Sequence, residues 1–106
     1  MKNKNITIVQ GDTFAFGVEF QGLEQDLETA FFTCKDIDNE TLIFQKSLAD
    51  GISKVEDEKY RVRIAPEDTI TRAPGKYLYD FTIGVNSDNF TLMEGILTVT
   101  RSITRG

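Results

Sequence analysis

The side chains most able to do chemistry in this 106-residue chain are 17 acids and a single cysteine, and the chain has no histidine. Without histidine there is no Ser–His or Cys–His nucleophile pair, no imidazole proton shuttle and no histidine ligand for a metal. One cysteine cannot form a disulfide within the chain. Cys34 alternates with Phe32 on an apolar face, which predicts a buried thiol that behaves as a small hydrophobic group. The sequence therefore indicates a protein that is not an enzyme and holds no cofactor.

The densest group of acids, in residues 36–40, is the first candidate for a metal site. Hard cations such as Ca²⁺ take several oxygen ligands from a loop, and an EF-hand loop also needs glycine at its sixth position and glutamate at its twelfth. Counted from Asp36, those positions hold Thr41 and Ser47. We therefore expect a solvated hairpin turn at residues 36–40, and we predict no metal site.

The segment of residues 75–80 carries a structural signal. Gly75 and Tyr77 form a Gly-x-Tyr pattern, which is typical of the tyrosine corner of immunoglobulin-like sandwiches, where the tyrosine hydroxyl bonds to backbone a few residues upstream. Tyr77 is the predicted corner residue, and residues 73–75 supply the preceding turn. Asp80 lies in the same strand. We expect it to accept hydrogen bonds from backbone or from a basic side chain rather than to act in catalysis.

Charge is distributed unevenly along the chain. The net charge is −5, from 12 bases and 17 acids, which disfavours general binding to nucleic acid or to an anionic membrane. The two ends hold four bases and no acid, so residues 5–100 keep 8 bases and 17 acids, a balance of −9. The four bases are Lys2, Lys4, Arg101 and Arg105. Two interpretations stay open: solvated basic tails, or, if the ends meet in space, one basic patch that docks an acidic partner.

Alternating apolar residues predict β-strands along most of the chain. In residues 12–20, apolar side chains such as Phe14 and Phe16 fall at every second position. The last strand is expected to bend at Gly95, since glycine within a strand pattern often marks a bulge. Seven short strands separated by turns predict a single all-β domain over residues 1–106, an antiparallel sandwich. The predicted strands lie at residues 6–8, 12–20, 29–35, 41–46, 59–65, 77–85 and 90–101.

Two smaller features complete this pattern. Pro66 is expected to begin a single helical turn between two strands, because its ring fixes φ near a helical value. Arg61 and Arg63 share one face of their strand with no aromatic residues between them. That arrangement favours a solvated or edge-protecting face over a nucleic-acid stripe.

Six segments recur in the same order in one group of proteins: residues 9–14, 32–35, 44–48, 64–69, 75–80 and 91–95. Over roughly residues 6–104, the chain thereby resembles the small immunoglobulin-like proteins encoded by prophages and tailed phages of Gram-positive bacteria. It is similar to the N-terminal domain of phage baseplate upper proteins, in which a Gln-Gly-Asp start and a Gly-x-Tyr strand frame a sandwich. The resemblance implies an immunoglobulin-like sandwich of about seven strands and no catalytic residues.

One function is expected, with one alternative. We expect a structural or accessory protein of a phage or prophage virion, in the tail, the baseplate or the head–tail region. It docks other virion proteins, or copies of itself, through strand edges or patches at residues 6–10, residues 90–101 and the basic ends. The alternative is a carbohydrate- or host-surface-binding module, for which Phe31 and Phe90 are the candidate exposed rings. No small-molecule substrate is expected.

The sequence contains no apolar stretch of the length that a signal peptide or a transmembrane helix requires. We therefore expect synthesis in the host cytoplasm, followed by incorporation into the virion, with no membrane partner.

Overall fold

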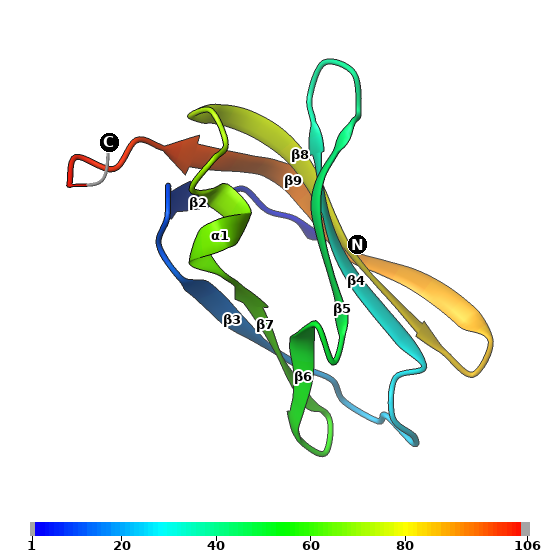
Figure 1. Ribbon diagram of the computed structural model, residues 1–106. Coiled ribbons are helices and arrows are strands. Elements are labelled where there is room, and N and C mark those ends of the chain that lie inside the picture. The colour runs from blue at the N-terminus through cyan, green and yellow to red at the C-terminus, as the bar shows by residue number, and fades with distance from the viewer. Residues whose placement is uncertain (1, 105–106) are drawn as a thin grey trace.

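Nine β-strands and one short helix make up the fold of residues 2–104, the part of the chain that the computed structural model describes (Figure 1). The strands form one hydrogen-bonded path in the order β1-β9-β8-β4-β5-β6-β7-β3, and β2 also pairs with β9. The elements are β1 (Lys2–Asn3), β2 (Ile6–Val9), β3 (Phe14–Glu19), β4 (Thr29–Asp36), β5 (Leu42–Leu48), β6 (Gly51–Glu56), β7 (Lys59–Ile64), α1 (Pro66–Thr69), β8 (Gly75–Val85) and β9 (Asp88–Thr100).

The path folds into two layers that face each other (Figure 1). One layer contains β4, β5, β8 and β9, with β1 and β2 along its edge, and the other contains β3, β6 and β7. A two-residue parallel pairing between β5 and β6 joins the layers. Across the core, the ring of Phe16 lies 5.9 Å from that of Phe32 and 6.3 Å from that of Phe81. The predicted all-β, immunoglobulin-like sandwich is therefore confirmed. Its strands are not all antiparallel, contrary to the prediction, because β1 and β2 run parallel to β9 and β5 runs parallel to β6.

Side-chain alternation explains most of these strands. In β7, Tyr60, Val62 and Ile64 are buried while Arg61 and Arg63 are exposed, as the sequence pattern predicts. Burying one face of each strand supplies the main driving force for packing the two layers. The helix begins at Pro66, as predicted, and its four residues are too few to cross a membrane.

Two sequence expectations about strands are wrong. The bulge in the β8–β9 pairing lies at Leu92, between the partners of Phe81 and Thr82, and Gly95 pairs regularly with Tyr79. Gly95 has a different role, because a Cβ at this position would meet the carbonyl oxygen of Lys4 at 2.4 Å. The glycine thus allows the N-terminal segment to approach β9 closely.

The second wrong expectation is the absence of a strand at Gly51–Glu56, which forms β6. Only Ile52 in this strand is buried. The strand therefore lacks the alternation by which the other strands can be recognised.

Candidate docking site

The tyrosine corner has the geometry that its sequence pattern predicts. The hydroxyl of Tyr77 donates a hydrogen bond to the backbone carbonyl of Ala73, four residues upstream. Tyr77 is buried, and Gly75 at the start of β8 has a φ of 150°. The bond ties the connection between α1 and β8 to the start of β8, so this group has a structural role.

Asp80 lies on the outer face of β8, half-buried. Its cross-strand partners are Thr33 in β4 and Glu94 in β9. Burial raises the pKa of the Asp80 carboxyl, Lys35 opposes the rise, and Glu94 adds to it. Two acids thus face each other directly across the β8–β9 pairing, which is a destabilising arrangement in an isolated sheet.

The basic residues at the two ends do not converge within the described residues. β1 and β2 run parallel to β9, so the backbone N–H of Lys4 bonds to Glu94, whereas Val9 pairs with Thr100 just before Arg101. Lys4 therefore lies beside the middle of β9, about 20 Å along the strand from Arg101. The side chain of Lys2 and all of Arg105 lie outside what the structure describes. A single patch that unites Lys4 with Arg101 is not formed.

Two further candidates from the sequence have structural roles. Cys34 is 1% exposed, and burial raises the pKa of its thiol to about 12, partly opposed by the charge of Arg72. The carboxylate of Asp36 accepts a hydrogen bond from the backbone N–H of Asp38 at 2.8 Å, which confirms the hairpin turn. Within residues 2–104, no three Cys, Asp or Glu side chains are placed to hold a metal ion.

An open strand edge is the feature that best fits a docking site. Within residues 2–104, β3 pairs with β7 alone, and its second edge has no strand beside it. The backbone N–H of Phe20 bonds to the carbonyl of Glu58, in register with the antiparallel pairing of β3 and β7. In such a pairing the backbone groups of every second residue face the partner strand, so the even-numbered residues of β3 face β7. The N–H and C=O groups of Ala15, Gly17 and Glu19 therefore point toward the open edge. Such groups form a template for another extended chain.

An apolar groove lies along this open edge. It has a volume of about 440 Å³ and separates β3 from the edge formed by β1, β2 and β9. On the β3 side, the inward-facing side chains are only half-buried, unlike those of β7. We call this feature the β3 groove, and its lining residues are Lys4, Ile6, Phe14, Phe16, Gly17, Val18, Glu19, Phe20, Leu92 and Met93.

The sequence places docking edges at residues 6–10 and 90–101. Within residues 2–104, β2 pairs with β9 along one edge and has no strand beside the other, so it also presents an open edge, across the groove from β3. By contrast, β9 from Met93 onward is paired on both edges. The alternation of β3 does not differ from that of a strand inside a sheet, so the pattern gave no sign of its open edge. Gly17 was the available signal, because glycine within a strand often marks the close approach of another backbone.

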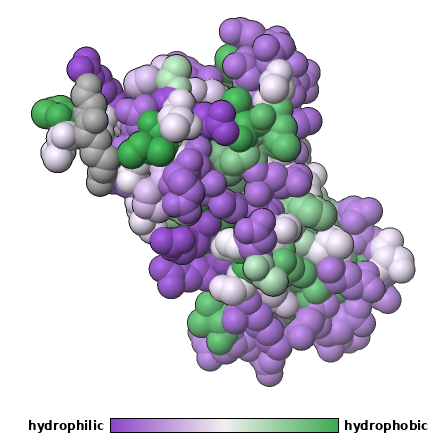
Figure 2. All heavy atoms as spheres, viewed as in Figure 1, coloured by the Kyte–Doolittle hydropathy of each residue, from purple (hydrophilic) through white to green (hydrophobic). Residues whose placement is uncertain are grey.

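The two candidate sugar-binding rings lie apart. Phe31 pairs with Thr82, so it lies on the outer face of its layer, whereas Phe90 pairs with the buried Ile83 and lies on the inner side. Phe90 is nevertheless 49% exposed, because the β8–β9 hairpin extends beyond the second layer (Figure 1). Figure 2 shows a mostly hydrophilic surface with separate hydrophobic patches. The two rings do not form one aromatic platform.

Comparison with known proteins identifies the fold alone. No protein-family model and no curated protein matches the sequence. A solved structure of a candidate glycoside hydrolase from Bacteroides vulgatus ATCC 8482 matches 92% of this chain with a TM-score of 0.55 and 13% identity. This chain corresponds to only 16% of that protein's length. The extracellular domain of the voltage-gated sodium channel beta4 subunit matches 97% of this chain and 95% of its own, with a TM-score of 0.49 and 12% identity.

Proposed function

We propose that this chain is a non-enzymatic docking module, a structural or accessory protein of a phage or prophage virion that binds a neighbouring virion protein by strand addition. The observation that carries the proposal is the open edge of β3 beside an apolar groove. The phage assignment rests on the sequence resemblance, and the docking mode rests on the geometry of the edge.

The groove indicates what kind of segment binds. A strand added to β3 forms backbone hydrogen bonds with Ala15, Gly17 and Glu19, while every second side chain of the added strand enters the groove. The groove is lined largely by apolar side chains, including Phe16 and Met93. The partner segment is therefore extended and carries apolar residues at alternate positions.

A pair of substitutions at Gly17 tests this mode of docking. Gly17→Pro removes an N–H that points to the open edge and leaves the β7 hydrogen bonds intact, as edge strands tolerate. Gly17→Ala is the matched control, because a Cβ at this position would lie 3.9 Å from its nearest neighbour and the N–H is kept. Thermal unfolding verifies that both variants fold.

The readout is the amount of each variant in purified particles, measured by mass spectrometry against the major capsid protein. We expect wild type and Gly17→Ala to be present and Gly17→Pro to be strongly depleted. Absence of the wild-type chain from particles would refute the virion assignment. Equal incorporation of Gly17→Pro would refute strand addition at β3.

A further inference from the structure

The outer face of the β3-β6-β7 layer carries two arginines that have no acidic partner. Arg61 and Arg63 are exposed, lie about 7 Å apart along β7, and form no ion pair with any acid in residues 2–104. We call these two residues the arginine row.

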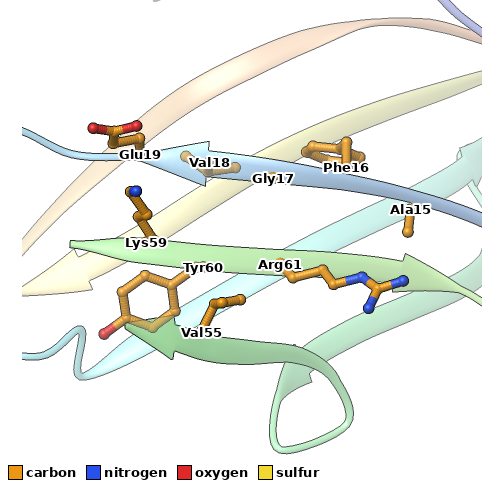
Figure 3. Close-up of a pocket in the computed structure, with 9 residues that line it drawn as sticks. All are labelled: Ala15, Phe16, Gly17, Val18, Glu19, Val55, Lys59, Tyr60 and Arg61. Carbon is orange, nitrogen blue, oxygen red and sulfur yellow. The ribbon is translucent and has the colours of Figure 1, made fainter. Parts of the chain in front are cut away.

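The strand neighbours of the arginine row are small and uncharged. Arg61 lies between Gly17 in β3 and Ser53 in β6, and Arg63 lies beside Ala15. By contrast, Lys59 on the same strand forms a 2.8 Å ion pair with Glu56. Figure 3 shows the shallow hollow at this surface, where Arg61 extends along the sheet toward Ala15 and Val55 lies below it. A partner can therefore approach the arginines closely.

The opposite layer carries two neighbouring acids on its outer face. Asp80 and Glu94, which we call the acid pair, face each other across β8 and β9 on the outer face of that layer. The half-buried side chains of Leu78 and Ile96 lie beside the acid pair. The residue across from Asp80 on β4 is the uncharged Thr33, and Lys35 is the base nearby whose charge acts on Asp80. Carboxylates accept paired hydrogen bonds from guanidinium groups, and a partly desolvated contact of this kind is strong.

We propose that copies of this chain associate head to tail, with the arginine row of one copy docked on the acid pair of the next. The two surfaces lie on the outer faces of opposite layers, so each copy has one of each free for a neighbour (Figure 1). Val55 on one face and Leu78 and Ile96 on the other add apolar contact beside the charges. Because different surfaces meet, the association does not close at two copies and can continue into a ring or a row.

A second copy is the occupant that the charges favour. Two copies of net charge −5 repel at long range, so the meeting of an arginine row with an acid pair is the contact that opposite charges favour. The arginine row lies next to the open edge, since Gly17 and Ala15 flank Arg61 and Arg63. The two proposals are separated by their readouts, because self-association is measured on the purified chain and strand addition on its incorporation into particles. Wild type that stays monomeric would therefore overturn self-association and leave strand addition at β3 standing.

Two charge-reversal variants of the full chain test the proposal by sedimentation velocity. The row variant is Arg61→Glu with Arg63→Glu, and the acid-pair variant is Asp80→Lys with Glu94→Lys. A control with the same net charge as the row variant combines Arg101→Glu with Arg105→Glu, both in the segment that follows β9. Circular dichroism verifies that every variant folds.

We expect wild type and the Arg101/Arg105 control to form species that grow with concentration. Each surface variant alone is expected to lose at least about tenfold in association constant, since one side of the contact is reversed. An equimolar mixture of the two surface variants is expected to associate again, because the intact row meets the intact acid pair and the two reversed surfaces are also opposite in charge. Wild type that stays monomeric up to millimolar concentration, a mixture that stays monomeric, or surface variants that associate like wild type would each overturn the proposal.

Discussion

The hydroxyl of Tyr79 in β8 donates a hydrogen bond to the backbone carbonyl of Lys4, 75 residues away in sequence. Tyr79 is 4% exposed, and its ring stacks on that of Phe32 with 5.2 Å between centroids. A core side chain thus holds the N-terminal segment against β9 rather than against β3. This contact is one reason that the edge of β3 stays open.

Tyr79→Phe keeps the ring and removes only this hydrogen bond. We expect a loss of about 1 kcal/mol in the free energy of unfolding. Hydrogen exchange is also expected to accelerate in β2 (Ile6–Val9) while the core of β8 stays protected. Uniform acceleration over the whole sheet would show that the bond does not act on the N-terminal segment.

Two glycine-to-alanine substitutions are expected to have opposite effects. Gly95→Ala places a Cβ 2.4 Å from the carbonyl oxygen of Lys4, so it displaces the N-terminal segment and costs about 2 kcal/mol. Gly17→Ala meets only ordinary contacts and is expected to stabilise the fold by about 0.5 kcal/mol, because alanine loses less backbone entropy. Urea unfolding of both variants measures the difference. Equal effects at the two positions would contradict the close approach of Lys4 to β9.

The ion pair between Lys46 and Asp68 links β5 to α1. Its atoms lie 2.7 Å apart, both side chains are 12% exposed, and the Asp68 carboxylate also accepts the backbone N–H of Ala65. Asp68→Ala is expected to destabilise the fold by about 3 kcal/mol, because it leaves a buried ammonium group unpaired. Adding Lys46→Met is expected to restore part of that loss in a double-mutant cycle. Strictly additive losses would show that the two groups are not coupled.

Cys34 is expected to be inert in the folded protein. Burial raises the pKa of its thiol from an ordinary 9.0 to about 12, so almost no thiolate is present at pH 8. A thiol reagent should label the protein only as fast as it unfolds, and urea should accelerate the reaction. Rapid labelling of the native protein would contradict this burial.

The same shift predicts how stability depends on pH. The folded state holds the thiol proton more tightly than the unfolded state. The contribution of Cys34 to the free energy of unfolding is therefore complete below about pH 9 and is lost as the pH rises toward 12. Cys34→Ala should therefore show a shallower loss of stability than wild type over this range. An identical pH profile for the two proteins would contradict the shift.

Sequence reasoning was accurate where burial alternates along a strand. The buried face of β7, the hairpin at Asp36, the start of α1 at Pro66 and the two-layer class were all predicted, because each depends on local chemistry. β6 was missed because a single side chain, that of Ile52, is buried in it. The bulge was placed at Gly95 rather than Leu92, because a glycine needed for close approach and a glycine at a bulge look alike in sequence.

The candidate site depends on contacts that no local pattern records. Whether β3 lies at an edge is decided by the path of the N-terminal segment, which Tyr79 holds against β9. Likewise, the basic ends were expected to converge only if the terminal strands brought them together. Parallel pairing of β2 with β9 separates Lys4 from Arg101 instead.

Hydrogen exchange along β3 (Phe14–Glu19) tests the proposed docking most directly, with the free chain compared to the chain in purified particles. The N–H groups of Ala15, Gly17 and Glu19 point to the open edge, so we expect them to exchange rapidly in the free chain and to become protected in particles. The N–H groups of Phe16 and Val18 face β7 and serve as the internal control, protected in both states. Edge amides that stay as fast in particles as in the free chain would contradict strand addition at β3.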